Sequence, residues 1–231
     1  MAEGSQPYTS VTIALLYLEP LYSFSMSKRF LELKGKKFVK DLKVVLKDIE
    51  PYVRAVRPLW NGRPFTNFSL RAREIWSLWL LCVVLHEMYH KNITFGEDDE
   101  SDGIIADLQA EDWIRVENVS ALDNPKRKPM PKGEQRIIEA IESKMKKGAA
   151  YAKGKMLTVF FDGAGAWHRN KVREAINGKH SFEAVYLIGL LNDRGGTEYS
   201  YTVTELHEND SVTYMITIAS DFTGWTITRI Q

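Results

Sequence analysis

Two carboxylate side chains, Asp102 and Glu117, stand at matching positions on two short apolar segments. The segments, residues 103–107 and 113–119, are separated by a short polar stretch, which is typical of a β-hairpin. With the turn centred on residues 109 and 110, Asp102 lies directly opposite Glu117, and directly opposed Cβ atoms in an antiparallel pair are about 4.5–5.5 Å apart. Two carboxylates at that separation repel each other unless a cation lies between them.

The cation that suits this pair is a divalent ion that prefers oxygen ligands. Mg²⁺ is typically held by one or two carboxylates together with waters and phosphate oxygens, and Mn²⁺ favours the same oxygen ligands. Such an ion lowers the pKa of a bound water and stabilises a departing phosphate oxygen. The pair of acids therefore predicts metal-assisted hydrolysis of a phosphate ester.

The order of elements around the hairpin resembles the core of the PD-(D/E)XK nuclease superfamily. The resemblance covers residues 67–161, with a helix at 70–90 before the hairpin, and a helix at about 134–151 and an apolar strand at 156–161 after it. The fold that it implies is α/β and restriction-endonuclease-like, with a mixed sheet flanked by helices.

The resemblance also extends to a short motif. That family carries an Asp on the hairpin, and then a Glu and a Lys separated by one residue; the matching pieces here are Ser101-Asp102-Gly103 and Glu117-Asn118-Val119. The resemblance implies an Mg²⁺-dependent endonuclease in which Asp102 and Glu117 bind the metal and belong to the catalytic set. Nucleic acid is then the expected partner, with DNA favoured over RNA.

Val119 stands where that family has its lysine. Some members place the lysine on the following helix, and Lys144 is the matching candidate because it lies three residues after Ile141, on the side of the apolar stripe. Lys147 shares that face one turn later, whereas Lys146 points away. We expect Lys144 to be the catalytic lysine, and the choice between Lys144 and Lys147 stays open.

An acidic residue on the first helix of the core is a further metal or water ligand in that family. Glu74 and Glu87 are both available on the helix at 70–90. Glu74 follows an arginine at the point where the helix turns apolar, which resembles the start of the family's helix. We therefore place Glu74 in the expected catalytic set.

Local clusters of basic residues predict where nucleic acid would bind. The net charge is +1, which excludes a uniformly basic surface. One cluster lies in a proline-rich loop after Glu117, and a second follows the strand at 156–161. The residues expected to contact the phosphate backbone are Lys126, Arg127, Lys128, Lys147, Arg169 and Lys171.

The segment His86-Glu87-Met88-Tyr89-His90 supports an alternative of another class. It matches the HExxH pattern, in which two histidines four residues apart on a helix bind zinc and the glutamate acts as the base of a metallopeptidase. Lys91 and Asn92 follow at once, where such helices usually continue apolar, and no third ligand is specified. A nuclease-like protein that binds nucleic acid without cutting it is the other alternative.

The elements that position these residues are expected in two parts. Residues 1–64 form a mainly helical elaboration, in which Phe38, Leu42, Val45 and Ile49 recur at helical spacing until Pro51 ends the helix. Residues 65–231 form the nuclease-like core. The core comprises a buried helix from about Asn67 or Ser69 to His90, the hairpin, a helix at 134–151, a strand at 156–161, a helix at 169–176, a strand at 184–191, and antiparallel strands from 197 onward. Alternating strands and helices indicate a parallel portion of sheet.

The remaining sequence features indicate the cellular compartment in which the protein is expected. Cys82 is the only cysteine, so no intramolecular disulfide and no cysteine-based zinc site can form. The apolar segment 11–21 is too short to span a bilayer, and we expect a core strand or short helix there. A cytoplasmic protein without a membrane partner is the expectation, with a homodimer left open.

Overall fold

The structure of the protein is a computed structural model that describes residues 32–33, 35–55, 64–65, 67–90, 92–122, 131–161 and 166–231. Three features singled out in the sequence lie outside the described residues. They are the apolar segment 11–21, residues 57–63 of the connecting loop that the sequence predicts at 57–64, and the basic residues Lys126, Arg127 and Lys128.

A mixed sheet forms the centre of the described part of the chain. Its eight strands follow one another in chain order. Neighbouring strands are antiparallel except at the middle of the sheet, where β3, β4 and β5 are parallel. The strands are β1 (Ile93–Gly96), β2 (Ile104–Asp107), β3 (Asp112–Ala121), β4 (Lys155–Phe161), β5 (Ala184–Asn192), β6 (Tyr199–Leu206), β7 (Ser211–Ile218) and β8 (Trp225–Arg229). The expected α/β class, the parallel portion and the C-terminal antiparallel strands are thus confirmed.

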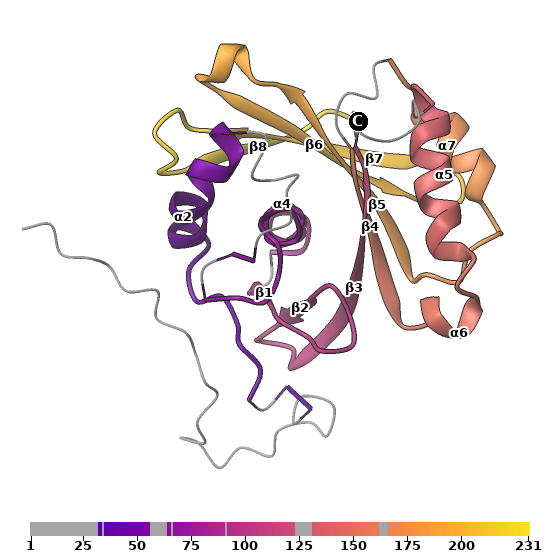
Figure 1. Ribbon diagram of the computed structural model, residues 1–231, viewed down its shortest axis with the longest axis horizontal. Helices are drawn as coiled ribbons and strands as arrows, with labels where there is room; N and C mark the ends of the chain where they lie inside the picture. Colours follow the sequence, from indigo (N-terminus) through magenta and orange to yellow (C-terminus); the bar gives the residue numbers. More distant parts are fainter. Residues whose placement is uncertain are drawn as a thin grey trace, which may run out of the picture.

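The sheet curls around helix α4 (Ala72–Tyr89), which Figure 1 shows end-on inside the hollow. Every residue of α4 from 72 to 85 except Arg73 and Glu74 is buried, as expected for a helix that is apolar almost all round. Helix α2 (Leu42–Arg54) packs beside α4 and completes this inner core. The boundary between parts at residue 64 stays a prediction.

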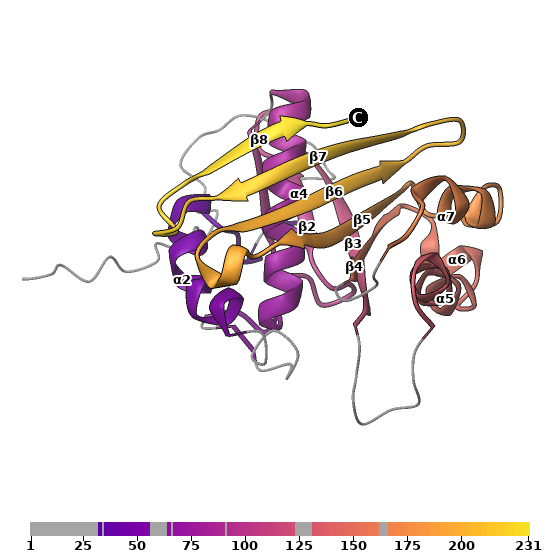
Figure 2. The ribbon, with the colours of Figure 1, turned by 90° about the horizontal axis from the view of Figure 1, so that it is seen from above.

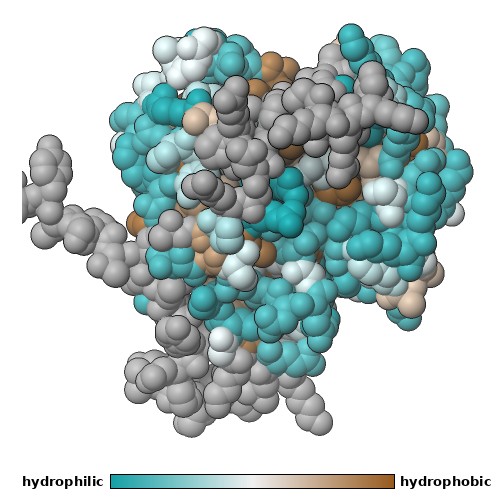
Figure 3. All heavy atoms as spheres, in the orientation of Figure 1, coloured by the Kyte–Doolittle hydropathy of each residue, from teal (hydrophilic) through white to brown (hydrophobic). Residues whose placement is uncertain are grey.

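The outer face of the sheet carries a second layer of helices. These are α5 (Glu134–Met145), α6 (Ala149–Ala152) and α7 (Arg169–Ile176), which lie together on one side of the sheet in Figures 1 and 2. Their apolar residues, such as Ile137, Ile141 and Val172, form a separate core with the outward-facing residues of β4 and β5. This layer presents mainly hydrophilic residues to solvent (Figure 3).

Two predicted helix ends are wrong. Pro51 lies inside α2 instead of ending it, and Phe38 precedes that helix and forms an isolated bridge with Gly96. Val53 is buried against the inner core two residues past Pro51, and this packing offsets the backbone hydrogen bond that a proline lacks. At the other helix, α4 starts at Ala72 and not at Asn67 or Ser69, because the Glu74 carboxylate accepts the Arg71 N–H and caps that turn.

The single helix predicted over 134–151 is also wrong. Residues 146–148 form a turn between α5 and α6, where Gly148 has φ +94°, a backbone conformation that other residues rarely adopt. The turn directs Tyr151 back toward β3, with consequences for the site described below. The predicted helix at 169–176 and the strands at 156–161 and 184–191 are confirmed, the helix with the same bounds.

We expect Gly103→Ala to destabilise the protein by about 1–3 kcal/mol, the usual cost of overpacking a well-packed position. A Cβ atom at Gly103 would lie 2.4 Å from Leu78 Cδ1 in α4, and Gly103 has φ +152°. The measurement is the free energy of unfolding in urea. Gly224→Ala is the control because no atom lies within 4 Å of a Cβ there. Equal stability of the two variants would contradict the prediction.

Candidate active site

The β2–β3 hairpin places Asp102 and Glu117 opposite each other. Ile104 pairs with Arg115 and Asp107 with Asp112, and the same register continued by two residues pairs position 102 with 117. The Asp102 Oδ2 atom accepts the Asn118 N–H at 2.7 Å, which fixes the first carboxylate to the strand that carries the second. The hairpin predicted from the sequence is confirmed.

Lys144, in the last turn of α5, reaches both carboxylates. Its Nζ atom lies 3.2 Å from Asp102 Oδ2 and 2.9 Å from Glu117 Oε2. Its side chain is 12% exposed and that of Glu117 is 6% exposed, so solvent screens this pair only weakly. The structure therefore brings together three of the four residues that the sequence placed in one site, Asp102, Glu117 and Lys144.

A second lysine, Lys155, was missed by the sequence reasoning. It is the first residue of β4, and its Nζ atom lies 2.8 Å from Glu117 Oε1, the oxygen that Lys144 does not bind. In the parallel register Glu117 pairs with Leu157, so Lys155 lies two residues away on the same face of the sheet. The sequence signal was a lysine at the start of an apolar strand, but its meaning depends on a register that the sequence does not specify.

Tyr151, from α6, is the second missed residue. Its hydroxyl donates to Glu117 Oε2 and accepts hydrogen bonds from Lys144 at 3.3 Å and from Lys147 at 3.1 Å. The Lys147 and Lys155 ammonium groups lie 4.4 and 4.5 Å from the centre of its ring. Lys147 thus contacts the tyrosine, and of the two lysines left open by the sequence it is Lys144 that contacts the carboxylates.

The protonation states follow from this arrangement. Burial favours the neutral form of Glu117, but hydrogen bonds from Lys155, Tyr151 and Lys144 outweigh it and hold the pKa of Glu117 below its usual value. Burial opposes the charge of Lys144, yet Glu117 and Asp102 raise the pKa of Lys144 well above its usual value. Burial and the Glu117 carboxylate raise the pKa of Tyr151 to about 12. At neutral pH Glu117 is therefore ionised, Lys144 is charged and Tyr151 is neutral.

We expect Lys155→Met to raise the pKa of Glu117, because the first of the hydrogen bonds that lower it is lost. A depressed carboxylate pKa contributes stability above the unfolded value of about 4.3, and this stability is lost as the pH falls through the folded pKa. The variant should therefore show a weaker loss of stability on acidification. The pKa is measured by carboxyl-carbon NMR and the stability by urea unfolding, with the exposed Lys146→Met as the control. An unchanged Glu117 pKa would refute the assignment.

Glu74 lies beside this cluster as a helix cap. Its carboxylate accepts the Arg71 N–H at 2.8 Å, and burial together with the charge of Asp102 raises the pKa of Glu74. No hydrogen bond or ion pair among the described residues joins it to Lys144 or Lys155. Glu87 is exposed in the last turn of α4, thirteen residues or about 20 Å along the helix from Glu74.

The loop that carries Asp102 is anchored by a buried carboxylate, Asp98. Its side chain is fully buried and forms ion pairs with Lys36 and, at 2.8 Å, with Arg115 Nε. Ser101 Oγ lies 2.8 Å from both Asp98 Oδ2 and the Gly103 carbonyl oxygen, and its single proton is donated to one or the other. These contacts hold the residues on both sides of Asp102, so its position does not depend on Lys144 alone.

The donor set suits a magnesium-like ion better than zinc. The Lys144 ammonium is a cation already within reach of both carboxylates, and no described residue donates to the other oxygen of Asp102, Oδ1. Two carboxylates and waters satisfy Mg²⁺, whereas structural and catalytic zinc sites need three or more protein ligands. Within the described ranges, no group of three or more His, Cys, Asp or Glu residues could hold a metal ion.

The remaining predicted residues lie elsewhere. Lys171, in α7, forms an ion pair of 2.8 Å with Glu134 and lowers the pKa of Glu134 to about 2. Glu134 precedes Lys144 by ten residues of α5, or about 15 Å, so Arg169 and Lys171 lie away from the carboxylates. His86 and His90 are both exposed at the end of α4, where His90 is the C-cap with φ +50°.

No described helix combines the length and apolar character needed to cross a membrane. Comparison with known proteins identifies no relative: no family model matches this chain, and neither a curated protein nor a solved structure is significantly similar to it.

Proposed function

We propose that this protein is a metal-dependent nuclease that hydrolyses phosphodiester bonds, with DNA as the favoured substrate. The observation that carries the proposal is the single ammonium group of Lys144 held between Asp102 and Glu117. A lysine beside two opposed carboxylates on a hairpin supplies the groups that a phosphodiesterase site needs: ligands for a divalent cation and a positive charge for the phosphate.

The order of elements supports a restriction-endonuclease-like core. Helix α4, strands β1, β2 and β3, helix α5 and strand β4 follow one another, with the antiparallel hairpin leading into a parallel crossover. This is the order that suggested the PD-(D/E)XK superfamily, with the acids on the hairpin. In this proposal the lysine of the motif, absent at Val119, is replaced by Lys144 from α5.

Each residue of the candidate site has a role in this reaction. Asp102 and Glu117 would hold Mg²⁺, or Mn²⁺ in its place, and the bound ion would supply a water of lowered pKa and a positive charge for the leaving oxygen. Lys155 and Tyr151 keep hydrogen bonds to Glu117 and fix its orientation. Lys144 stays protonated, because its pKa is raised, and so acts as a cation rather than a base. Released from the carboxylates, it neutralises charge that develops on the phosphate oxygens.

The cellular setting forms part of the same proposal. Cys82 is free and buried, which suits the reducing cytoplasm that we propose as the location. A homodimer stays a prediction.

The test is cleavage of single- and double-stranded DNA and RNA by the native chain, with Mg²⁺ or Mn²⁺ and with EDTA. We expect metal-dependent cleavage that Asp102→Asn abolishes, because the hairpin then offers only one charged ligand. The matched control is Asp112→Asn, at the start of β3. Cleavage by Asp102→Asn at the native rate would overturn the site. Nucleic-acid binding without any cleavage would instead support the non-catalytic alternative.

A further inference from the structure

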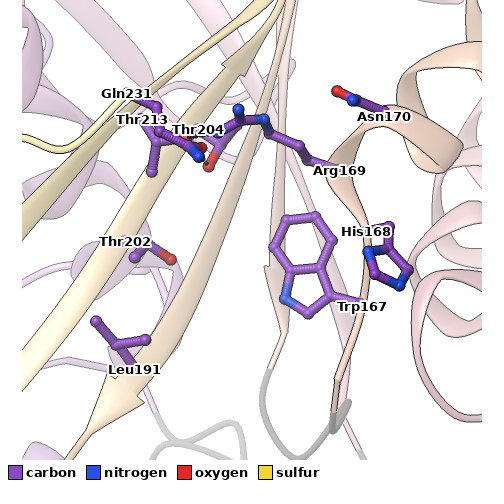
Figure 4. Close-up of a pocket in the computed structure, with 9 residues that line it drawn as sticks. All are labelled: Trp167, His168, Arg169, Asn170, Leu191, Thr202, Thr204, Thr213 and Gln231. Atoms are coloured by element: carbon purple, nitrogen blue, oxygen red, sulfur yellow. Dashed lines mark hydrogen bonds between the residues drawn. The ribbon is translucent and has the colours of Figure 1, made fainter.

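A cavity of about 410 Å³ lies on the outer face of the sheet, beside the start of α7. Figure 4 shows Trp167 and Arg169 extending from the α7 side toward the strands that carry Leu191, Thr202 and Thr213. None of the residues of the candidate active site lines this cavity.

The position of this cavity relative to the active site follows from the strand register. Glu117 and Leu206 occupy one row across β3, β4, β5 and β6, so Thr204 lies two residues further along the same face. Three strand spacings of about 4.8 Å and a rise of about 3.3 Å per residue separate Glu117 from Thr204 by about 16 Å. A short run of stacked nucleotides, which rises about 3.4 Å per nucleotide along its axis, covers that distance.

Arg169 gives the cavity a positive charge without an acidic counterpart. Among the described residues, its side chain makes one long hydrogen bond of 3.4 Å, from Nη1 to Thr213 Oγ1, and no carboxylate there pairs with it. Lys171, two residues later on α7, is neutralised by Glu134. The Arg169 guanidinium is therefore available to an anion, and its planar set of donors matches a phosphate.

Trp167 and Leu191 give the same cavity an apolar wall. The indole is half-buried and touches Phe161 edge to face, with 5.0 Å between ring centroids. Leu191 is 57% exposed, which is unusual for a leucine on a sheet face next to a core. A flat aromatic ring facing an exposed aliphatic side chain suits a planar, partly apolar group, and nucleobases stack on such rings without sequence preference.

We propose that this cavity binds one nucleotide of a single-stranded nucleic acid, with the base stacked on Trp167 and the phosphate bound by Arg169. The hydroxyl groups of Thr202, Thr204 and Thr213 line the strand side, where they can meet the polar edge of the base or the sugar. The choice of a polynucleotide over another phosphate ester rests on the proposed function. The ligand would then be an unpaired stretch of the substrate, bound about 16 Å from the carboxylates.

Binding is measured by fluorescence anisotropy of labelled oligothymidylate and oligouridylate in EDTA, so that no cleavage occurs. Trp167→Ala should weaken binding about 10- to 100-fold, from the loss of base stacking. Trp167→Phe should retain most of the affinity, which separates stacking from a folding defect. Arg169→Gln should weaken binding and reduce the salt dependence by about one released ion. Arg173→Gln, the same charge change one turn later on α7 and outside the cavity, is the control.

The outcomes are separable from those of the proposed function. Native affinity in Trp167→Ala, equal effects of Arg169→Gln and Arg173→Gln, or the same dependence on Trp167 for a duplex would each overturn the cavity assignment. Cleavage that depends on Asp102 would leave the nuclease proposal standing in that case. Conversely, if binding depends on Trp167 but the native chain cleaves no substrate, the proposed nucleotide-binding cavity is supported and the proposed nuclease activity is refuted.

Discussion

Glu117→Gln should reduce cleavage by at least on the order of 10³-fold, since metal charge stabilisation amounts to several kcal/mol and each 1.36 kcal/mol is about a factor of ten. Glu117 binds Lys144 through one oxygen and Lys155 through the other. The native cluster of Asp102, Glu117, Lys144 and Lys155 carries two negative and two positive charges. The amide leaves one negative against two positive charges, so the site repels a divalent cation.

The loss should therefore appear in metal binding before any chemistry. Mn²⁺ binding is measured by calorimetry or electron paramagnetic resonance, and the cleavage rate under single-turnover conditions. Glu142→Gln is the matched control, because Glu142 lies on α5 close to the site but is exposed. Native metal affinity in Glu117→Gln, with the fold intact, would remove Glu117 from the proposed ligands.

The parts of the site that depend on local geometry could be predicted from the sequence. A hairpin fixes its own register once the turn is placed, so the opposition of Asp102 and Glu117 follows from counting residues. Helical spacing likewise placed Lys144 on the inward side of its helix, next to Ile137 and Ile141. Both inferences use distances along one element or between two adjacent strands.

The missed residues depend on contacts between distant parts of the chain. Lys155 reaches Glu117 only because β4 pairs with β3 in one parallel register, which places the two residues on the same face of the sheet. Tyr151 reaches it because the chain turns at Gly148 instead of continuing the helix. The pattern of apolar residues is compatible with an unbroken helix, and it carries no information about the register between strands joined by a long crossover.

The same distinction applies to the fold. The apolar run of α4 predicted a buried helix, but not that the sheet would curl around it, since that shape arises from strand pairing over the full width of the sheet. Strand β1, four residues long, was not recognised because so short a segment carries little periodicity. The prediction that Pro51 ends its helix was wrong. The unfavourable helix propensity of one residue costs less free energy than the burial of the surrounding helix provides.

Lys144→Met should lower the cleavage rate by about 10²- to 10³-fold, the typical cost of removing one group that stabilises transition-state charge. The structure adds an effect on metal binding that the sequence did not suggest. Lys144 lies within reach of both carboxylates and would compete with an ion bound between them. Without it, Asp102 and Glu117 keep two negative charges against the single positive charge of Lys155, so Mn²⁺ should bind more tightly in the absence of nucleic acid.

The two variants therefore change metal affinity in opposite directions, although both lose cleavage. Calorimetric titration with Mn²⁺ measures this difference, and Lys146→Met is the control because that side chain is exposed on the adjacent turn and contacts neither carboxylate. Burial favours the protonated form of Glu117, and this effect is less opposed once Lys144 is removed. The Mn²⁺ titration is therefore done at neutral pH or above, where the hydrogen bonds from Lys155 and Tyr151 keep Glu117 ionised. Weaker Mn²⁺ binding in Lys144→Met would mean that the ammonium supports the ion instead of standing in its place.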